Sequence, residues 1–490
     1  MNRDTSRDGL RNKAEYYALT HFGQLWRLAQ RVPALERIVN RALVNSAVLK
    51  TRTRPHPTSL KFEYTSWCSL TDRTFSGRHL PPAQAGYTSS LPPASEVAQA
   101  FLRPAGQQRL SSTSTLLLSH FAQWFTDGFL RTDRNDFRKN TSNNEIDLSP
   151  VYGVTPSITE GLRAFTGGLL KSQMIDGSEF PPFYFDDNGQ AKPEFAGVPL
   201  FVPPDLPEER RKRLFASGVE RANVQIGFVM FNVLCLREHN RLCRAFQAAH
   251  PGWDDERLFQ TARNTMIAMV LKLVIEEYIN HIAPYHFKFK AQPRSFYQSS
   301  WYRTNWMTVE FNLLYRWHGL VTDTVHVGDA DIDVVDTLFN NQLLIERGLG
   351  ASFDDASRHP CGRIGLRNTH HSLLRTELAS IEHGRRANLQ PYNAYRAYCG
   401  YPPVTRFEQI TGDQERQRLL KELYKEPDRV ELYTGLFAED PRSGSPLSPL
   451  IGRMVGIDAF SQALTNPLLS EHVFHEGTFG KIGWDTLCNT

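Results

Sequence analysis

Two long runs with helical periodicity constrain the fold of this chain more than any other feature. They cover about residues 216–247 and 254–283, where apolar side chains recur every three or four positions. The segment HPGWDDE separates them, and its Pro, Gly and Asp residues end one helix and begin the next. No stretch alternates apolar and polar residues for long enough to build a large sheet. We therefore predict a mainly α-helical fold.

The rest of the chain divides into shorter helices and long irregular stretches. The Pro-, Ser- and Thr-rich text of 51–110 predicts extended segments, and 132–215 predicts loops and short turns. Neither an internal repeat nor a low-complexity tract is present in the sequence. Shorter helices are predicted at 111–131, which a Ser/Thr cap opens, and at 302–318, 331–345, 391–399, 406–412 and 414–424.

Composition excludes several classes of protein. The 490 residues are 40% hydrophobic and 22% charged, as in ordinary folded proteins. The net charge is only +4, and no long basic tract indicates a nucleic-acid partner. The six cysteines form no CxxC pair and lack the dense spacing of a disulfide scaffold, so a reducing compartment is expected.

The N-terminal region carries the signals that bear on location. Residues 1–23 lack the apolar core of a secretory signal, and no run of about 18 apolar residues could span a bilayer. We therefore expect a cytoplasmic protein. Residues 15–50 place apolar side chains at helical spacing with arginines between them, which predicts two short amphipathic helices broken near Pro33. Such helices either pack on a core, which the pattern alone favours, or lie in a membrane interface as a peripheral contact.

Three segments place polar groups within apolar helices. Gln123 and Asp127 are four residues apart and share one helix face. The segment LREHNRLCRAF crowds charged residues behind an apolar turn, and VEFNLLYRWHGLV holds Tyr315 and His318 three residues apart. Taken singly, each has an ordinary structural explanation, namely a capped helix end, a salt-bridged surface and a buried polar pair.

Taken together and in this order, the segments resemble a known family. LREHNRLC resembles the signature of animal-type heme peroxidases, and its continuation through HPGWDDERLFQTARNTMIAMVLKLVIEEYINHIAPYHFKF is similar to the cyclooxygenase branch. The likeness continues in VEFNLLYRWHGLVTDT, NNQLLIERG, GRIGLRN, YNAYR and ELYKEPDRVELYTGL. It implies a helical heme-peroxidase fold with a catalytic domain over 56–490, and a segment over 1–55 similar to the family's membrane-binding helices. No cysteine-rich EGF-like module is present in the sequence.

The resemblance implies roles for three residues near a heme. His318 matches the proximal ligand of the heme iron, which an imidazole suits chemically. Tyr433 matches a tyrosine that supports this ligand, and Tyr315 matches the tyrosine that peroxide-activated heme oxidises to a radical. In cyclooxygenases that radical abstracts hydrogen from an unsaturated fatty acid, and O2 then adds. The cofactor implied is heme b, bound non-covalently because Val224 occupies the position of a covalent link.

A second group of residues matches the fatty-acid channel of the family. Their apolar character is also what any protein core would show, so the resemblance alone distinguishes them. Positions that line or back the channel are Phe311, Leu314, Trp317 and Tyr278, Tyr285 matches a constriction near the mouth, and Ser461 matches the serine that aspirin acetylates.

The distal side of the expected heme departs from the family. Gln123 is kept, but Asp127 replaces the histidine that takes the proton of the incoming hydroperoxide, a contribution of roughly 10²–10⁴-fold in rate. A buried carboxylate can do this work if its pKa rises. His120 lies about 10 Å from Asp127 along the helix axis and is a poor substitute. Arg221 resembles the distal arginine of mammalian peroxidases and plant α-dioxygenases.

The arginine that holds the substrate carboxylate in cyclooxygenases is also missing. Its position aligns near Ala47, and Lys50 or Arg52 either replaces it or belongs to an exposed basic loop. The leading hypothesis is an oxygenase that uses a Tyr315 radical to add O2 to an unsaturated fatty acid or similar lipid, started by a hydroperoxide. The alternatives are a hydroperoxide isomerase, peroxygenase or peroxidase that uses Asp127, and a heme-binding protein with little catalysis. A homodimer is a further hypothesis.

Overall fold

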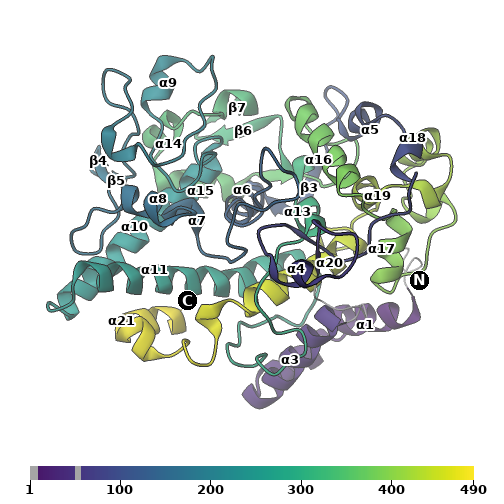
Figure 1. Cartoon of the computed structure of the whole chain (residues 1–490), viewed down its shortest axis with the longest axis horizontal. Helices are drawn as coiled ribbons and strands as arrows, with labels where there is room; N and C mark the ends of the chain where they lie inside the picture. Colours follow the sequence, from purple (N-terminus) through teal and green to yellow (C-terminus); the bar gives the residue numbers. More distant parts are fainter. Residues whose placement is uncertain (1–8, 50–56, 490) are drawn as a thin grey trace.

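The computed structural model describes residues 9–49 and 57–489. Within these ranges helices dominate, and the strands form four two-stranded antiparallel sheets (Figure 1). The predicted mainly α-helical fold is therefore confirmed. The pairs are β1 Thr58–Ser59 with β2 Gly77–Arg78, β3 Leu110–Thr115 with β8 Pro360–Gly362, β4 Gln173–Ile175 with β5 Ser178–Phe180, and β6 Thr324–Val327 with β7 Ala330–Asp333.

The helices fall into long ones that build the core and short ones that connect them. The helices of eight or more residues are α1 Leu10–His21, α2 Gly23–Gln30, α3 Pro33–Leu49, α5 Ala94–Phe101, α6 Leu116–Thr126, α10 Ile226–Ala249, α11 Asp255–Leu273, α15 Leu349–Arg358, α16 Leu374–Arg386, α18 Gln414–Tyr424, α20 Pro449–Leu464 and α21 Glu476–Asn489. The shorter ones are α4 Trp67–Thr71, α7 Ser149–Tyr152, α8 Pro156–Leu162, α9 Glu208–Lys212, α12 Ile279–Ile282, α13 Val309–Leu314, α14 Gln342–Arg347, α17 Tyr392–Tyr398 and α19 Leu432–Ala438.

The two long predicted helices form α10 and α11. The predicted break between them is confirmed, because α10 ends at Ala249 and the Asp254 side chain caps α11 by accepting from the Arg257 N–H at 2.7 Å. The start predicted at 216 is wrong, because residues 216–225 form a loop and α10 begins at Ile226. Gly218 packs so closely on the Ser149 carbonyl that an added Cβ would lie 2.0 Å from that oxygen, which holds this stretch in a loop rather than a helix.

Other predicted boundaries also shift where tertiary contacts decide. Residues 110–115 form β3 instead of the first turn of α6, because they pair with β8 and the Ser111 hydroxyl accepts from the backbone of this segment. The helix predicted at 302–318 shrinks to α13, which Thr308 caps by accepting from the Phe311 N–H at 3.0 Å. The helix predicted at 331–345 is wrong, since β7 and α14 occupy this part of the chain, and 406–412 forms a single 3-10 turn. Helices at 391–399 and 414–424 are confirmed as α17 and α18.

The core that carries the site lies between α6, α10, α11, α13 and α20. α6 is fixed to α10 by a buried bond in which Trp124 Nε1 donates to Asn232 Oδ1 at 2.8 Å. α11 continues into a π-helical turn, η4 Val274–Tyr278, before α12. The stretch from Asp255 to Ile282 is long and apolar enough to cross a membrane, but 67% of its most apolar window is buried in the protein, as in a core helix.

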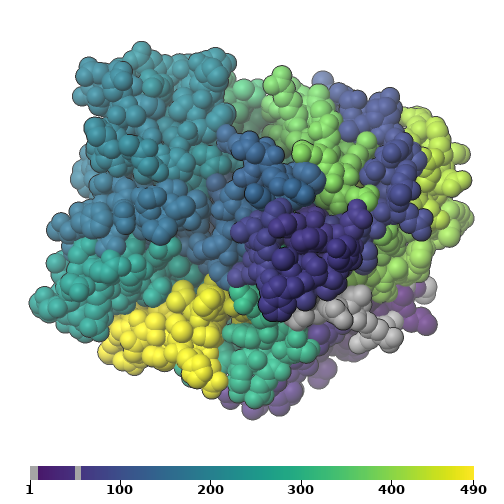
Figure 2. All heavy atoms as spheres, in the orientation of Figure 1, coloured from purple at the N-terminus to yellow at the C-terminus, as the bar shows by residue number. Residues whose placement is uncertain are grey.

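Three helices, α1 to α3, form the N-terminal part at the lower edge of the views in Figures 1 and 2. Pro33 is the first residue of α3, so the predicted break is confirmed. Leu19, Val44 and Val48 join the main buried cluster, and α3 lies against α20. The domain boundary at residue 55 stays a prediction.

Candidate functional site

His318 is held by a buried carboxylate that the sequence analysis did not identify. Nδ1 of His318 lies 3.1 Å from Oε1 of Glu377, close enough for an ion pair although the groups are not aligned for a strong hydrogen bond. The Tyr433 hydroxyl donates to Oε2 of Glu377 at 2.7 Å, and the Thr369 hydroxyl donates to Oε1 at 2.7 Å. Tyr433 thus supports His318 through Glu377.

The electrostatics of this group favour an oriented imidazole. Burial alone would raise the pKa of Glu377, but His318 and the hydroxyls of Tyr433 and Thr369 outweigh burial and lower it. Glu377 is therefore a carboxylate at neutral pH. A carboxylate that fixes one imidazole nitrogen leaves the other nitrogen for a metal ion, as in many metal sites.

Tyr315 ends α13 within an aromatic cage. Its ring stacks on Trp317 at 4.8 Å between centroids and meets Phe311 edge-on at 5.1 Å. Burial raises the pKa of Tyr315, and an interaction with the Tyr278 hydroxyl lowers it by a smaller amount. The phenol is therefore protonated at neutral pH. The chain turns between Tyr315 and His318, which begins the 3-10 turn η5 His318–Leu320, so the two do not share one continuous helix.

Tyr278 reaches the cage from the π-helical turn η4. Its ring lies 6.4 Å from that of Trp317 and nearly parallel to it, and its side chain is buried. A π-helical turn widens the helix by one residue and re-aims the side chains that follow, and such turns occur often at functional sites. Leu314, also predicted at the channel, is fully buried in the core.

Two of the predicted distal residues, Asp127 and Arg221, are in contact at the end of α6. Nη2 of Arg221 lies 3.3 Å from Oδ1 of Asp127, while Oδ2 of Asp127 is buried without a hydrogen-bond partner among the described residues. Gln123 is one turn earlier on α6 and is exposed, and Arg221 is 46% exposed. The arrangement gives one carboxylate oxygen to an arginine and leaves the other for a ligand.

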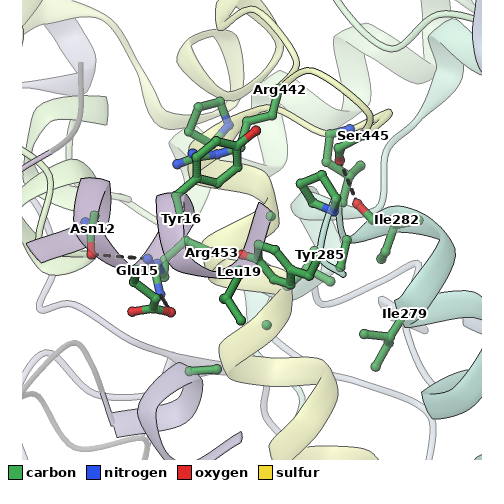
Figure 3. A pocket seen from close by; sticks show the side chains of 18 of the residues that line it. Asn12, Glu15, Tyr16, Leu19, Ile279, Ile282, Tyr285, Arg442, Ser445 and Arg453 are labelled. Carbon is green, nitrogen blue, oxygen red and sulfur yellow. Dashed lines mark hydrogen bonds and ion pairs between the residues drawn. The ribbon is translucent and has the colours of Figure 1, made fainter. Parts of the chain in front are cut away.

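A cavity opens between α1, α3, α12 and α20. Its volume is about 80 Å³, and Tyr285 is among the residues that line it (Figure 3). Ile279, Val455, Ala459 and Phe460 form apolar walls. Phe311, Leu314 and Trp317 do not line this cavity, and all three are buried in the core.

The Ser461 assignment receives no support from this cavity. The Ser461 hydroxyl donates to the Asp458 carbonyl of its own helix at 3.1 Å, and Ser461 is absent from the lining. Residues that share a helix face are three or four apart, and Val455 and Ala459 of α20 meet that condition. A polar residue two positions beyond Ala459 therefore points away from the cavity wall.

The sequence of this chain matches a known protein family. The family model described as "Animal haem peroxidase" matches residues 133–464. Prostaglandin G/H synthase 2 of Cavia porcellus is 32% identical over 480 residues, which cover 95% of this chain and 77% of that protein. The chain belongs to the animal haem peroxidase family. It is therefore an oxidoreductase, and the predicted family is confirmed.

Solved structures of other proteins share the fold of this chain. The fatty acid alpha-dioxygenase of Oryza sativa superposes with a TM-score of 0.70 at 16% identity, covering 98% of this chain and 94% of that one. Peroxidase A of Dictyostelium discoideum superposes with a TM-score of 0.65 at 18% identity, covering 89% and 90%. At these identities the likeness concerns the fold alone.

Family membership implies that the chain binds heme, and the residues present fit such a group. The described residues contain no cluster of three or more His, Cys, Asp or Glu that could hold a bare metal ion, whereas heme iron needs only an axial ligand such as His318. Arg316 interacts electrostatically with residues from both the His318 side and the Asp127 side of the expected heme site. Burial lowers the pKa of Arg316, and charges at Tyr433, Arg221, Asp127 and Glu377 all bear on it. The unpartnered Oδ2 of Asp127 is an orphaned buried atom in the same region.

The position of Glu377 on the apolar face of α16 is a signal of its role that the sequence contains. Glu377 shares the buried stripe of α16 with Ser380, Ile381 and His383. A carboxylate on the apolar face of an amphipathic helix needs a partner, since burying an unpaired charge is costly. A carboxylate at such a position is a candidate to orient the imidazole of a buried histidine.

Proposed function

We propose that this peroxidase-family enzyme adds O2 to an unsaturated fatty acid or a similar lipid by way of a radical on Tyr315. The observation that carries the proposal is the aromatic cage, which holds a buried, protonated phenol three residues before His318 in the chain. The names of the prostaglandin G/H synthases and of the fatty acid alpha-dioxygenases support the same reaction class.

His318, Glu377 and Tyr315 would have separate roles in this reaction. His318, oriented by Glu377, would hold heme b non-covalently. When bound, that group supplies the one-electron oxidation that a hydroperoxide drives. The Tyr315 phenoxyl oxygen takes a hydrogen atom from a C–H bond of the lipid, O2 adds to the carbon radical, and the resulting peroxyl group takes the hydrogen atom back from Tyr315. One lipid and one O2 thus give one lipid hydroperoxide, and Tyr315 is restored.

The aromatic cage would protect this chemistry from water. Phe311 and Trp317 are 2% and 5% exposed, so the Tyr315 radical would form in an apolar environment. The Tyr278 hydroxyl would orient the phenol. On the distal side, Oδ2 of Asp127 would take the hydroperoxide proton while Arg221 holds Oδ1.

Substitution Tyr315→Phe tests the radical mechanism. We expect it to abolish O2 uptake with linoleate and a trace of hydrogen peroxide, because phenylalanine has no O–H bond to give up. The heme absorbance should stay unchanged, since His318 is untouched. Unaltered O2 uptake by the variant would sink the radical mechanism.

A second candidate function rests on Asp127 alone. The free Oδ2 suits a hydroperoxide isomerase, peroxygenase or peroxidase that acts on lipid hydroperoxides or H2O2, with Tyr315 in a structural role. Asp127→Asn should lower turnover of a peroxide by roughly 10²–10⁴-fold under either function. The two functions differ in Tyr315→Phe, which would leave peroxide turnover and product intact under the second. The exposed turn residue Asp176 offers a matched control, Asp176→Asn, with no expected effect.

We further propose that the enzyme is cytoplasmic and contacts a membrane surface through α2 and α3. Support comes from large apolar side chains that these helices leave exposed: Leu25, Leu28, Leu35 and Ile38 are 58%, 60%, 42% and 67% exposed. Arginines lie between them in the sequence, at positions 27, 31, 37 and 41. Apolar side chains flanked by arginines suit an interface between lipid tails and anionic headgroups.

A further inference from the structure

A histidine that has no part in the proposed reaction lies in a buried ion pair. His79 directly follows β2, and its Nε2 lies 2.9 Å from each carboxylate oxygen of Asp458 on α20. Only 2% of the His79 side chain and 5% of the Asp458 side chain are exposed. A buried carboxylate is costly without a counter-charge, so the imidazole matters more here than it would at the surface.

The same histidine is tied to α13, the helix that ends at Tyr315. The His79 backbone N–H donates to Oε1 of Glu310 at 2.9 Å, and Glu310 is fully buried. Two residues earlier, the Gly77 N–H donates to the Met307 carbonyl at 2.9 Å, just before α13 begins. His79 thus binds α13 through its backbone and α20 through its side chain.

A further contact joins Asp458 to the aromatic cage. The Thr308 hydroxyl lies 3.5 Å from Oδ2 of Asp458, and the same hydroxyl begins α13 by accepting from the Phe311 N–H at 3.0 Å. Phe311 in turn meets the Tyr315 ring edge-on at 5.1 Å. Tyr315 follows Thr308 within a single turn-and-helix unit of about 10 Å along the axis. A shift at the Asp458 end of α13 is therefore passed on to the cage.

The surroundings of His79 favour its protonated form. Burial alone would lower the pKa of His79, but the carboxylates of Asp458 and Glu310 outweigh burial and raise it, against a smaller opposing effect of Arg303. Nδ1 of His79 has no hydrogen-bond partner among the described residues, so the imidazole interacts chiefly through Nε2. The titratable and charged side chains around the pair, from α13, α17, α20 and the adjoining segments, are Glu310, Tyr395, Tyr398, Asp458, Arg78 and Arg303.

The charge of Asp458 also acts on Tyr315. Burial raises the pKa of Tyr315 most, the Tyr278 hydroxyl lowers it, and the Asp458 carboxylate raises it further. The carboxylate therefore favours the phenol that keeps its O–H bond. That phenol is the form which the proposed reaction restores at the end of each turnover.

We propose that the His79–Asp458 ion pair is a positioning element for the Tyr315 cage, and that its charged form sets the alkaline limit of lipid oxygenation. Neither residue lines the cavity, and α13 packs against α20, so the pair acts through α13 rather than on the lipid. When His79 loses its proton, Asp458 keeps a buried charge without a counter-charge, and the fit of α20 on α13 weakens. This inference rests on the proposed oxygenase function.

The pH profile of O2 uptake with linoleate by the heme-loaded full-length protein tests the pair. We expect kcat of the wild type to fall as pH rises through the raised pKa of His79, above the ordinary value of 6.5. At neutral pH, Asp458→Asn should lower kcat by roughly 10²-fold, as a small misplacement of a reacting group does. KM should change by less than about twofold, because the cavity lining is untouched. Asp485→Asn, which breaks an exposed ion pair with Lys481 on α21, is the matched control and should change neither constant.

A double variant keeps the test decisive if Asp458→Asn fails to fold. His79→Met combined with Asp458→Leu replaces both charges by apolar side chains, a change that is often neutral or stabilising for buried ion pairs. Since this variant has no proton to lose at the pair, its kcat should stay level over the pH range in which that of the wild type falls. A fall of kcat at the same pH in the double variant and the wild type would overturn the inference.

Electron paramagnetic resonance of the radical formed with H2O2 gives a readout of how Tyr315 is held. The splitting by the two Cβ hydrogens depends on the angle between the phenol ring and the Cα–Cβ bond, so a displaced Tyr315 gives a different spectrum. The spectrum of Asp458→Asn at neutral pH should differ from that of the wild type and resemble that of the wild type at alkaline pH. Identical spectra under all three conditions would overturn the inference.

Hydrogen exchange of the heme-loaded protein without lipid separates this inference from the proposed function. The protection factor of the Phe311 amide, which depends on the Thr308 cap, should fall about tenfold or more in Asp458→Asn and stay unchanged in Asp485→Asn. This loss of protection in a protein that takes up no O2 with linoleate would overturn the oxygenase function and retain the positioning role. Normal O2 uptake by Asp458→Asn with an unchanged alkaline limit would overturn the positioning role and leave the oxygenase function intact.

Discussion

Glu377 orients the imidazole of His318, because it is the only carboxylate within ion-pair distance of that ring among the described residues. It receives a hydrogen bond on each oxygen, from Tyr433 and Thr369. Each donor stabilises the ionised form, so three side chains from separate parts of the sequence act on one ligand. A ligand held in this way loses little freedom when it binds a metal.

Glu377→Gln should weaken heme binding by about 10- to 100-fold, as the loss of an outer-sphere carboxylate does elsewhere. Heme titration followed by absorbance measures this affinity. The same variant tests the charge by its pH dependence. The folded-state pKa of Glu377 lies below the ordinary value of 4.5, so its ionised form stabilises the fold above that pH and the contribution disappears as pH falls through the lowered pKa.

Chemical unfolding of the heme-free protein at several pH values checks this second effect. The difference in free energy of unfolding between wild type and Glu377→Gln should be constant near neutral pH and should shrink below about pH 4.5. A difference that grows in acid would show that the Glu377 carboxylate is not stabilised in the folded protein. Glu408→Gln, on an exposed turn, serves as the control.

At the residue level, the sequence predicted site positions where the family resemblance reached them. The resemblance predicts His318, Tyr433, Asp127 and Arg221, and their contacts in the structure are consistent with their expected roles. Glu377 was not predicted, because it departs from the apolar pattern of the buried face of α16 and its partners His318 and Tyr433 lie far away in the chain. Only the fold shows which distant groups compensate a buried charge.

At the scale of single elements, local signals predicted helices well where caps are formed by nearby residues. The helix expected at 414–424 matches α18, whose cap Asp413 accepts from the Glu415 and Arg416 N–H groups. The helices expected at 302–318 and 331–345 failed, because strand pairing with β6 and the Thr308 cap set those boundaries. Both are local interactions, an N-cap and a hairpin, which the apolar spacing of these segments did not indicate.

A buried polar contact joins α6 to α10. Asn232 accepts from Trp124 Nε1 at 2.8 Å and donates to the Ser217 hydroxyl at 2.7 Å. Asn232→Leu should lower the free energy of unfolding by about 1–3 kcal/mol for each buried group that it leaves unsatisfied. It should also slow peroxide turnover, since α6 positions Gln123 and Asp127.

Thermal unfolding and a peroxidase assay measure the two effects of Asn232→Leu. Asn188→Ala, in an exposed turn, is the control and should change neither. Lower stability with unchanged peroxide turnover would mean that α6 keeps its place without this contact. Unchanged stability would mean that water satisfies Trp124 and Ser217 in the variant.

At the scale of the whole molecule, the N-terminal helices combine buried contacts with exposed apolar side chains, which the sequence offered as alternatives. The pattern of residues 15–50 left core contact and membrane contact as alternatives, and the structure shows both buried and exposed apolar side chains on these helices. Tyr16, Leu19, Leu43 and Ala47 line the cavity, while other apolar side chains of α2 and α3 stay exposed. A lipid leaving a membrane beneath these helices would meet the cavity directly.

This arrangement predicts that membrane contact and substrate supply are linked. The double variant Leu28→Glu and Ile38→Glu should reduce cosedimentation with phosphatidylcholine–phosphatidylserine vesicles by about tenfold or more, because it replaces two exposed apolar side chains with charges that repel anionic lipid. Leu234→Glu, on an exposed part of α10 away from these helices, is the matched control. O2 uptake with detergent-dispersed linoleate should be unchanged in the double variant, because neither residue lines the cavity. If the wild type fails to bind such vesicles at low salt, the exposed apolar face serves another purpose and the cavity must fill from solution.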